Sequence, residues 1–216
     1  MKKNFAIIGL SIFGATVATE LRESGHNVVV VDIDHEKINN IRDKVTSAII
    51  ADVTDQDVIR ELEVKKFDTI ILCIGDNFEA AIFALALLKQ EGAEMVIAQA
   101  KTALQKQILF KLGADEVVQP DRDMAERLSK RISMSNISDM FDFKGSTIAD
   151  LKVKKEYDGK SLRQLDLRRN FNITVLLIRK PGKDPEPVWD PDMILRHGDE
   201  ITVIGKEDDI IRAFQE

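Results

Sequence analysis

Short apolar runs rich in β-branched residues alternate with helical patterns along residues 1–135 of the chain. Runs of this kind are typical of strands that are buried on both faces of a sheet. The pattern predicts strands over residues 5–8, 27–31, 48–51, 69–73, 95–98 and 116–119. Strands that alternate with helices predict an α/β fold with a doubly wound parallel sheet.

The segments between these strands begin and end at residues that favour helix termini. Thr54 and Thr102 stand where a side-chain oxygen can cap a helix start, and Gly25 and Gly113 stand where a helix ends. We therefore predict a helix that ends before Gly25 and further helices over residues 35–43, 55–62, 77–90 and 103–111.

The remainder of the chain forms a different, smaller unit. Residues 131–144 are rich in Ser, Asn, Met and Asp and predict a connecting helix and linker. After them the pattern predicts strands over 147–153, 173–179 and 199–205 and helices over 161–165 and 208–215. We thus expect one domain over residues 1–135 and a linker helix with a small α+β domain over 136–216.

Composition narrows the class of protein. With 216 residues, of which 44% are hydrophobic, the chain can bury a proper core, and its net charge of -6 argues against nucleic-acid binding. No apolar run approaches the ~20 residues that cross a bilayer. Lys2 and Lys3 before an apolar segment also permit a signal peptide, which the glycines inside that segment disfavour. The single cysteine, Cys73, fits a reducing cytoplasm.

A glycine turn joins the first strand to the first helix. Gly9 and Gly14 match the outer positions of the dinucleotide fingerprint G-x-G-x-x-G, and Ser11 stands at the middle glycine. Such a turn lets phosphate oxygens approach the backbone and the unpaired N–H groups of the helix start. Asp32 closes the strand over 27–31, where the fingerprint has its ribose-binding acid. This order of features predicts a nucleotide site; a strand, turn and helix that bind nothing are the alternative.

Ligands of a doubly wound sheet bind beyond the carboxyl ends of the strands. The candidate nucleotide-binding residues are therefore found at or next to these ends: Gly9, Ser11, Ile12, Phe13, Gly14, Asp32, Asp34, Asp52, Val53, Ile74, Gly75 and Gln99. Asp52 can equally be an acid favoured by a helix dipole, and Gly75 can equally be a plain turn glycine. Cys73 has the position of a small buried hydrophobe.

The sequence holds few residue patterns that indicate an enzyme. The three histidines are scattered, and no cluster has the spacing of a metal site or of a Ser-His-Asp triad. The C-terminal unit is also small for a substrate domain. We expect a protein that is not an enzyme; the alternatives are a small NAD(H)-dependent oxidoreductase and a redox-sensing protein with the same fold.

Blocks along the whole chain resemble the KtrA/TrkA family, the RCK-domain regulatory subunits of bacterial Trk/Ktr potassium uptake systems. The matching blocks are residues 8–14, 31–34, 51–54, 73–77, 112–120, 159–162 and 199–205. The resemblance implies a Rossmann-like nucleotide-binding domain followed by an RCK C-terminal domain. It also implies dimers joined into a ring, whose shape changes with the bound ligand and gates potassium flux through a membrane subunit. The chain would then be cytoplasmic, peripheral to the inner face of the cell membrane.

The resemblance also implies roles for individual residues. It places the turn from Gly9 to Gly14 at the phosphates, Asp32 on the ribose, and Asp52, Val53 and Gly75 around the adenine. The chain departs from the family turn Gly-Leu-Gly-Arg-Phe-Gly at two positions, Ser11 and Ile12, and Gln99 replaces a basic residue. Charge-assisted hydrogen bonds to phosphate are the strong ones, and Ile12 and Gln99 remove two positive charges. This weakens the case for ATP, so ADP, AMP or NAD(H) are candidates alongside it.

Two further ligands follow from the resemblance. Asp121 matches a position where an acidic side chain joins a divalent cation at a dimer contact, although capping of the following helix explains it as well. Arg168, Arg169 and Asn170 resemble a region that binds cyclic di-AMP, although a solvated basic turn is the simpler interpretation.

Overall fold

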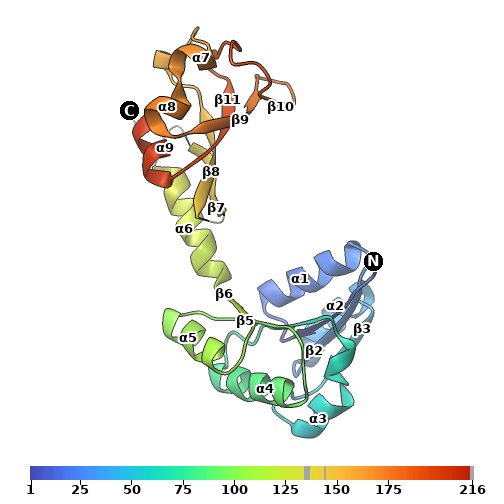
Figure 1. Ribbon diagram of the computed structural model, residues 1–216. Coiled ribbons are helices and arrows are strands. Elements are labelled where there is room, and N and C mark those ends of the chain that lie inside the picture. The colour runs from blue at the N-terminus through green and yellow to red at the C-terminus, as the bar shows by residue number, and fades with distance from the viewer. Residues whose placement is uncertain (134–136, 144, 215–216) are drawn as a thin grey trace. The chain divides into compact units, whose positions relative to one another are not determined.

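The computed structural model describes residues 1–133, 137–143 and 145–214, and these form two compact units, Met1–Arg122 and Asp123–Glu216 (Figure 1). We expected the division near residue 135. It falls earlier, inside helix α6 (Pro120–Ser133), and two basic residues of this helix form ion pairs within the second unit. Lys130 Nζ lies 2.7 Å from Glu207 Oε2, and Arg127 pairs with Asp139.

The first unit holds a six-stranded, wholly parallel sheet in the order β3-β2-β1-β4-β5-β6. Its strands are β1 (Asn4–Ile8), β2 (Asn27–Asp32), β3 (Ser47–Ile50), β4 (Thr69–Leu72), β5 (Val96–Gln99) and β6 (Glu116–Val118). The order runs one way from β1 to β3 and the other way from β4 to β6. Strands β1 and β4 therefore flank the point where the strand order reverses, and the predicted doubly wound sheet is confirmed.

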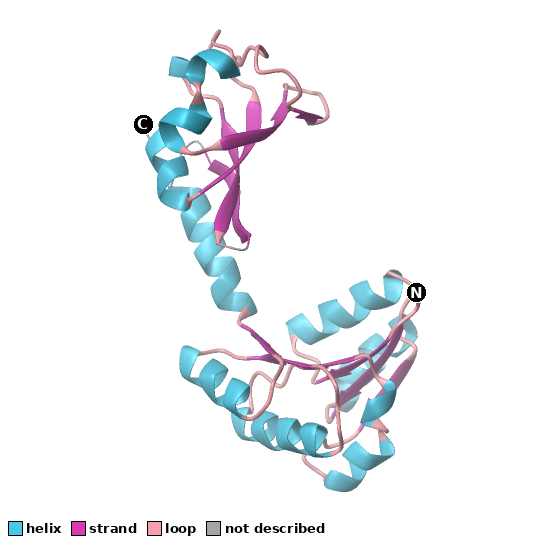
Figure 2. Cartoon of the chain, in the orientation of Figure 1, coloured by secondary structure: helices cyan, strands magenta, loops and turns pink. Residues whose placement is uncertain are grey.

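Helices cover both faces of this sheet (Figure 2). They are α1 (Ile12–Glu23), α2 (His35–Ile41), α3 (Gln56–Glu61), α4 (Phe78–Gln90) and α5 (Ala103–Lys111). In β1, Ala6 and Ile8 pack with residues of α3, α4 and α5, whereas Ile7 packs with residues of α1 and α2. Alternate side chains of one strand thus enter two cores, which explains why the strands are continuous apolar runs.

Two predicted helix caps had different outcomes. Thr102 caps α5 in a complete capping box with Gln105, as predicted. The prediction for Thr54 was wrong, because Asp55 caps α3 and accepts a hydrogen bond from the Asp57 N–H at 2.9 Å. The hydroxyl of Thr54 donates instead to Asp52 at 2.7 Å.

The second unit is built on a five-stranded antiparallel sheet in the order β10-β9-β11-β8-β7. Its strands are β7 (Ile137–Phe143), β8 (Ser146–Lys152), β9 (Thr174–Arg179), β10 (Glu186–Pro187) and β11 (Glu200–Gly205). Its short helices are α7 (Leu162–Leu165), α8 (Leu167–Phe171) and α9 (Glu207–Phe214). The predicted α+β domain is confirmed, with its core on one side of the sheet under α8 and α9.

The predicted linker over residues 131–144 was wrong in part. Residues 137–143 form β7, which pairs with β8, and residues 134–136 and 144 lie outside the described residues. A register shift between Ile137 and Asp139 interrupts the pairing. Because the shift breaks the alternation of buried and exposed side chains, the strand has no clean two-residue period in the sequence.

Candidate functional site

A cavity of about 340 Å³ opens at the carboxyl edge of the parallel sheet, beyond β1, β2 and β4. Backbone and side chains of the loops that follow these strands and β3 line it. The lining residues are Gly9, Leu10, Ser11, Val31, Asp32, Ile33, Lys37, Ala51, Asp52, Val53, Thr54, Cys73, Ile74, Gly75, Asp76, Asn77 and Ala80. The cavity therefore lies at the switch point where doubly wound sheets bind their ligands.

The candidate residues from the sequence fall into two groups. Those that line the cavity are Gly9, Ser11, Asp32, Asp52, Val53, Ile74 and Gly75. Those that do not line it are Ile12, Phe13, Gly14, Asp34 and Gln99. Lys37, Asp76 and Asn77 line it and were missed. Lys37 lies in the first turn of α2, so a search confined to the ends of strands does not find it. A positive charge five residues after Asp32 could have marked it as a candidate.

The two fingerprint glycines are required by close packing. Gly9 has a φ of +90°, and a Cβ built on it would lie 2.9 Å from the backbone carbon of Cys73. A Cβ on Gly14 would lie 2.4 Å from the carbonyl oxygen of Gly9 and 2.9 Å from the Cβ of Cys73. Side chains at either position would push α1 away from the sheet. The glycines thus let the start of α1 lie close to β1 and β4.

Ser11, which replaces the middle glycine, caps α1. Its Oγ accepts a hydrogen bond from the Gly14 N–H at 3.2 Å and donates one to Gln99 Oε1 at 3.1 Å. Its backbone is extended, with φ -62° and ψ 168°, so a Cβ causes no strain. The next residue, Ile12, is 91% exposed at the first position of the helix. The substitution therefore adds a cap and a link to β5 without distorting the turn.

Asp32 is held in place by the backbone of its neighbours. One carboxylate oxygen accepts the Leu10 N–H at 2.5 Å, and the other accepts the Asp34 N–H at 2.9 Å. Each oxygen has a further lone pair for a ligand hydroxyl. Asp34 itself caps α2, accepting from the Glu36 N–H at 2.8 Å. Backbone hydrogen bonds thus fix the orientation of the Asp32 carboxylate, whereas Asp34 caps the start of α2.

Asp52 and Cys73, which also line the cavity, have shifted pKa values. Hydrogen bonds from the backbone N–H and the hydroxyl of Thr54 lower the pKa of the Asp52 carboxyl below its usual value. Burial raises the pKa of the Cys73 thiol to about 12. At neutral pH the cavity thus presents an ionised Asp52 and a protonated thiol, and neither is poised to exchange a proton.

A lysine and an aspartate meet beside the cavity. Lys101, two residues beyond β5, places its Nζ 2.6 Å from Asp76 Oδ1. This hydrogen bond is the main cause of the lowered pKa of the Asp76 carboxyl, and the charge of Lys37 contributes to it. Positive charge therefore reaches this side of the cavity from α2 and from the segment after β5.

The remaining candidates lie away from this cavity. Asp121 is exposed in the first turn of α6, one residue after Pro120, so it is inside the helix and is not its cap. In residues 1–133, 137–143 and 145–214, no three His, Cys, Asp or Glu side chains gather in a way that could hold a metal ion. Arg168, Arg169 and Asn170 lie in α8 and are exposed. Across the described helices, none is both long and apolar enough to cross a membrane.

The fold and the cavity define a doubly wound α/β domain with a cavity at its switch point, joined to a small β-rich domain. Comparison with known protein families agrees: the TrkA-N domain matches residues 5–120 and the TrkA-C domain matches residues 147–216. The chain is also 33% identical over 215 residues to the Ktr system potassium uptake protein C of Bacillus subtilis (strain 168), covering 98% of this chain and 96% of that protein. The chain belongs to the TrkA family, and the resemblance seen in the sequence is confirmed.

Solved structures show the same fold. The GsuK channel bound to NAD superposes with a TM-score of 0.70 at 17% sequence identity, over 100% of this chain and 40% of that chain. The GsuK structure bound to ADP superposes with a TM-score of 0.50 at 20% identity, over 56% of this chain and 32% of that chain. This chain thus spans less than half the length of the channel it resembles.

Proposed function

We propose that the chain is a nucleotide-sensing regulatory subunit of a bacterial potassium uptake system of the Trk/Ktr type. The observation that carries the proposal is the cavity at the switch point, lined by Gly9, Asp32 and Gly75, in a chain that belongs to the TrkA family. The relative from Bacillus subtilis is named a potassium uptake protein, and the related GsuK structures are titled as bound to NAD and to ADP.

The proposed ligand is an adenine nucleotide: ATP, ADP, AMP or NAD(H). Asp32 would accept hydrogen bonds from the ribose hydroxyls, because its oxygens are already oriented by backbone N–H groups. The N–H groups of Ile12 and Phe13 at the start of α1 would face the phosphates, with the positive end of the helix dipole behind them. Val53 and Ile74 would cover the base, and Asp52 would lie at its edge.

Regulation would work by a population shift. The nucleotide moves an equilibrium between two ring shapes by no more than the difference in its affinity for them. Assembly of a homo-oligomer is supported by α6, where Met124, Leu128 and Ile132 repeat every four residues and are 61%, 42% and 73% exposed. The ring would sit in the cytoplasm against a membrane potassium-translocating subunit. A divalent cation at Asp121 and cyclic di-AMP near Arg168 stay predictions.

The proposal places the chain outside the enzymes. A dehydrogenase needs a group in its site whose pKa lies near the working pH. Asp52 has a lowered pKa and Cys73 a strongly raised one, so both shifts move away from neutrality.

Thermal unfolding of the purified full chain tests the proposal. A ligand that binds only the folded state raises the melting temperature, by an amount that grows with concentration above its Kd. We expect adenine nucleotides at millimolar concentration to raise it in wild type, and Asp32→Asn to reduce the shift. The arms are ATP, ADP, AMP, NAD+ and NADH, each with and without Mg²⁺, and cyclic di-AMP alone.

Two outcomes would contradict the proposal. A chain that is monomeric and whose melting temperature ignores all adenine nucleotides would not be a nucleotide-sensing ring subunit. A shift with NADH alone, together with hydride transfer to a carbonyl compound, would favour the oxidoreductase. Glu36→Gln serves as the matched control for Asp32→Asn, because Glu36 is exposed, carries the same charge and does not line the cavity.

A further inference from the structure

The lining of the cavity is short of positive charge for a polyphosphate. Among the described lining residues, three carboxylates (Asp32, Asp52 and Asp76) face one lysine, Lys37. Ile12 and Gln99, at the start of α1 and the end of β5, carry no charge, so neither supplies the missing positive charge. A ligand with more than one phosphate needs a further cation close by, because neutral donors bind phosphate less strongly than charged ones.

Lys101 lies at the right place to be that cation. A Cβ built on Gly75 would lie 3.4 Å from Lys101 Cε and 3.9 Å from Gln99 Oε1. The end of the Lys101 side chain therefore lies next to Gly75, a lining residue of the cavity, and its ammonium pairs with Asp76. Gln99 in turn accepts the hydrogen bond of Ser11 at the start of α1. Gln99, which is bonded to the start of α1, and Lys101 thus both lie next to Gly75.

The Lys101–Asp76 pair contributes little to holding the fold together. The Asp76 side chain is 94% exposed and that of Lys101 is 47% exposed. Exposed ion pairs of this kind contribute little net stability, because water screens the charges and ordering the side chains costs entropy. An ammonium held so loosely can change partner at small cost when a more highly charged anion arrives.

We infer that Lys101 binds the second phosphate of a nucleoside diphosphate, leaving Asp76 when the ligand enters. The inference rests on the proposed nucleotide site and adds its preference for the number of phosphates. A ligand with one phosphate is held at the start of α1 and does not need Lys101.

Isothermal titration of the full chain with AMP and with ADP tests the role of Lys101. We expect Lys101→Gln to weaken ADP binding about tenfold, the effect of losing one charge-assisted hydrogen bond. AMP binding should change less than twofold. Asp76→Asn should strengthen ADP binding severalfold, because it removes the carboxylate that competes for the ammonium. Lys111→Gln is the matched control, since it removes the same charge from the exposed end of α5.

The outcomes separate this inference from the proposed function. If wild type binds neither nucleotide, the proposed function falls and this inference falls with it. If wild type binds both and Lys101→Gln weakens them equally, or weakens neither, only the role of Lys101 is overturned. An unchanged ADP affinity in Asp76→Asn would overturn the exchange of partners. A ratio of ADP to AMP affinity that falls in Lys101→Gln and holds in Lys111→Gln would support it.

Discussion

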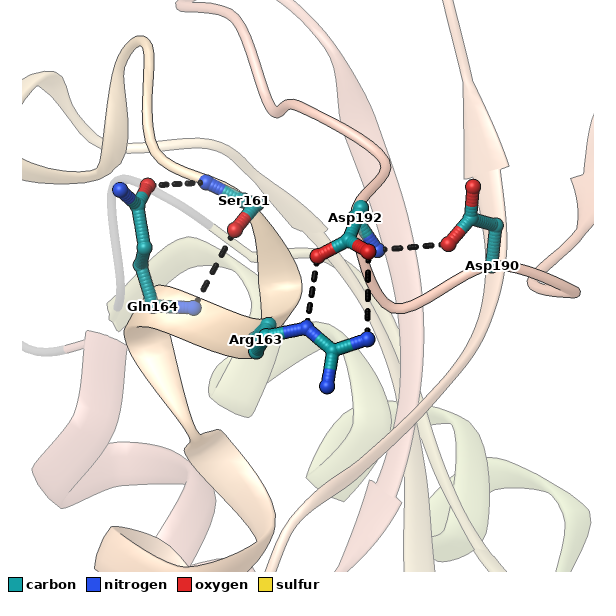
Figure 3. A network of polar contacts seen from close by, with 5 residues as sticks. All are labelled: Ser161, Arg163, Gln164, Asp190 and Asp192. Carbon is teal, nitrogen blue, oxygen red and sulfur yellow. Dashed lines mark hydrogen bonds and ion pairs between the residues drawn. The ribbon is translucent and has the colours of Figure 1, made fainter.

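The two units use their strand ends in opposite ways. In the first unit all strands are parallel, so the residues after β1, β2, β3 and β4 gather at one edge and line a cavity. In the second unit all strands are antiparallel, so their ends alternate between two edges. The polar side chains there bind one another: Arg163 holds Asp192 through two hydrogen bonds of 2.7 and 3.1 Å (Figure 3). The parallel direction of the strands thus brings four strand-end loops together around one cavity.

The largest predicted losses of stability come from substitutions in the two hydrophobic cores, one in each unit. Leu85 in α4 and Leu151 in β8 are both fully buried, one in each unit. Replacing either by Ala should lower the free energy of unfolding by about 3 kcal/mol, through lost burial and the cavity left behind. We expect Leu151→Ala to leave ADP affinity unchanged and Leu85→Ala to weaken it. Amide hydrogen exchange, which resolves the stability of each unit, and ADP titration make the measurement.

Independence of the two units is what this pair of variants tests. Loss of protection confined to residues 123–214 in Leu151→Ala, with normal ADP binding, would support it. Equal loss of protection in both units would show that they unfold together. The two units would then differ in ligand binding but not in stability.

A smaller effect is expected from Gly14, where the helix touches the sheet. In Gly14→Ala the new Cβ would meet the Gly9 carbonyl and Cys73, and the overpacking should cost about 2 kcal/mol. The shift of α1 should also weaken nucleotide binding. Gly25→Ala is the control: its φ of +88° strains an alanine, but nothing lies within 4 Å of the new Cβ. It should cost about 1 kcal/mol and leave binding intact.

Urea unfolding and ADP titration of both glycine variants would sharpen the contrast. If Gly14→Ala and Gly25→Ala lost the same stability and both kept ADP affinity, close packing at the glycine turn would not matter for the site. The inferred reason for the third glycine of the fingerprint would then be wrong.

Most of the fold could be predicted because its pattern is local. The parallel strands are continuous apolar runs, and the cap at Thr102 follows a sequence rule. The failures have physical reasons. Thr54 and Asp55 both carry a side-chain oxygen that can cap a helix start, and in the structure Asp55 caps α3. At β7 a register shift interrupts the alternation of buried and exposed residues, so the sequence of this strand predicts a linker.

The site was less predictable, because side chains reach further than strand ends. The positions of Gly9, Asp32 and Gly75 follow from the rule that ligands bind where parallel strands end. Lys101 comes after the end of β5, and only the structure shows that the end of its side chain lies next to Gly75. The Ile12 side chain is exposed to solvent and does not line the cavity, so a role for Ile12 through its backbone N–H stays a prediction.

The smallest predicted effects compare two carboxylates, one from each unit. Hydrogen bonds from Thr54 lower the pKa of Asp52, and the hydrogen bond from Arg163 lowers that of Asp192. A folded-state pKa below the unfolded one means that the ionised form stabilises the fold above the unfolded pKa. That contribution is lost as the pH falls through the folded pKa. Both groups are exposed to solvent, so screening keeps both contributions small.

Asp52→Asn and Asp192→Asn should therefore differ in binding more than in stability. At pH 7 Asp52→Asn should cost less than about 1 kcal/mol, and Asp192→Asn should shift the melting temperature only slightly. Each variant should approach wild type as the pH falls below the usual carboxyl value of 3.8. ADP affinity should change in Asp52→Asn alone, because only Asp52 lines the cavity. An Asp192→Asn variant with altered ADP affinity would show that the polar network of the second unit also senses the ligand, and would break the contrast between the units.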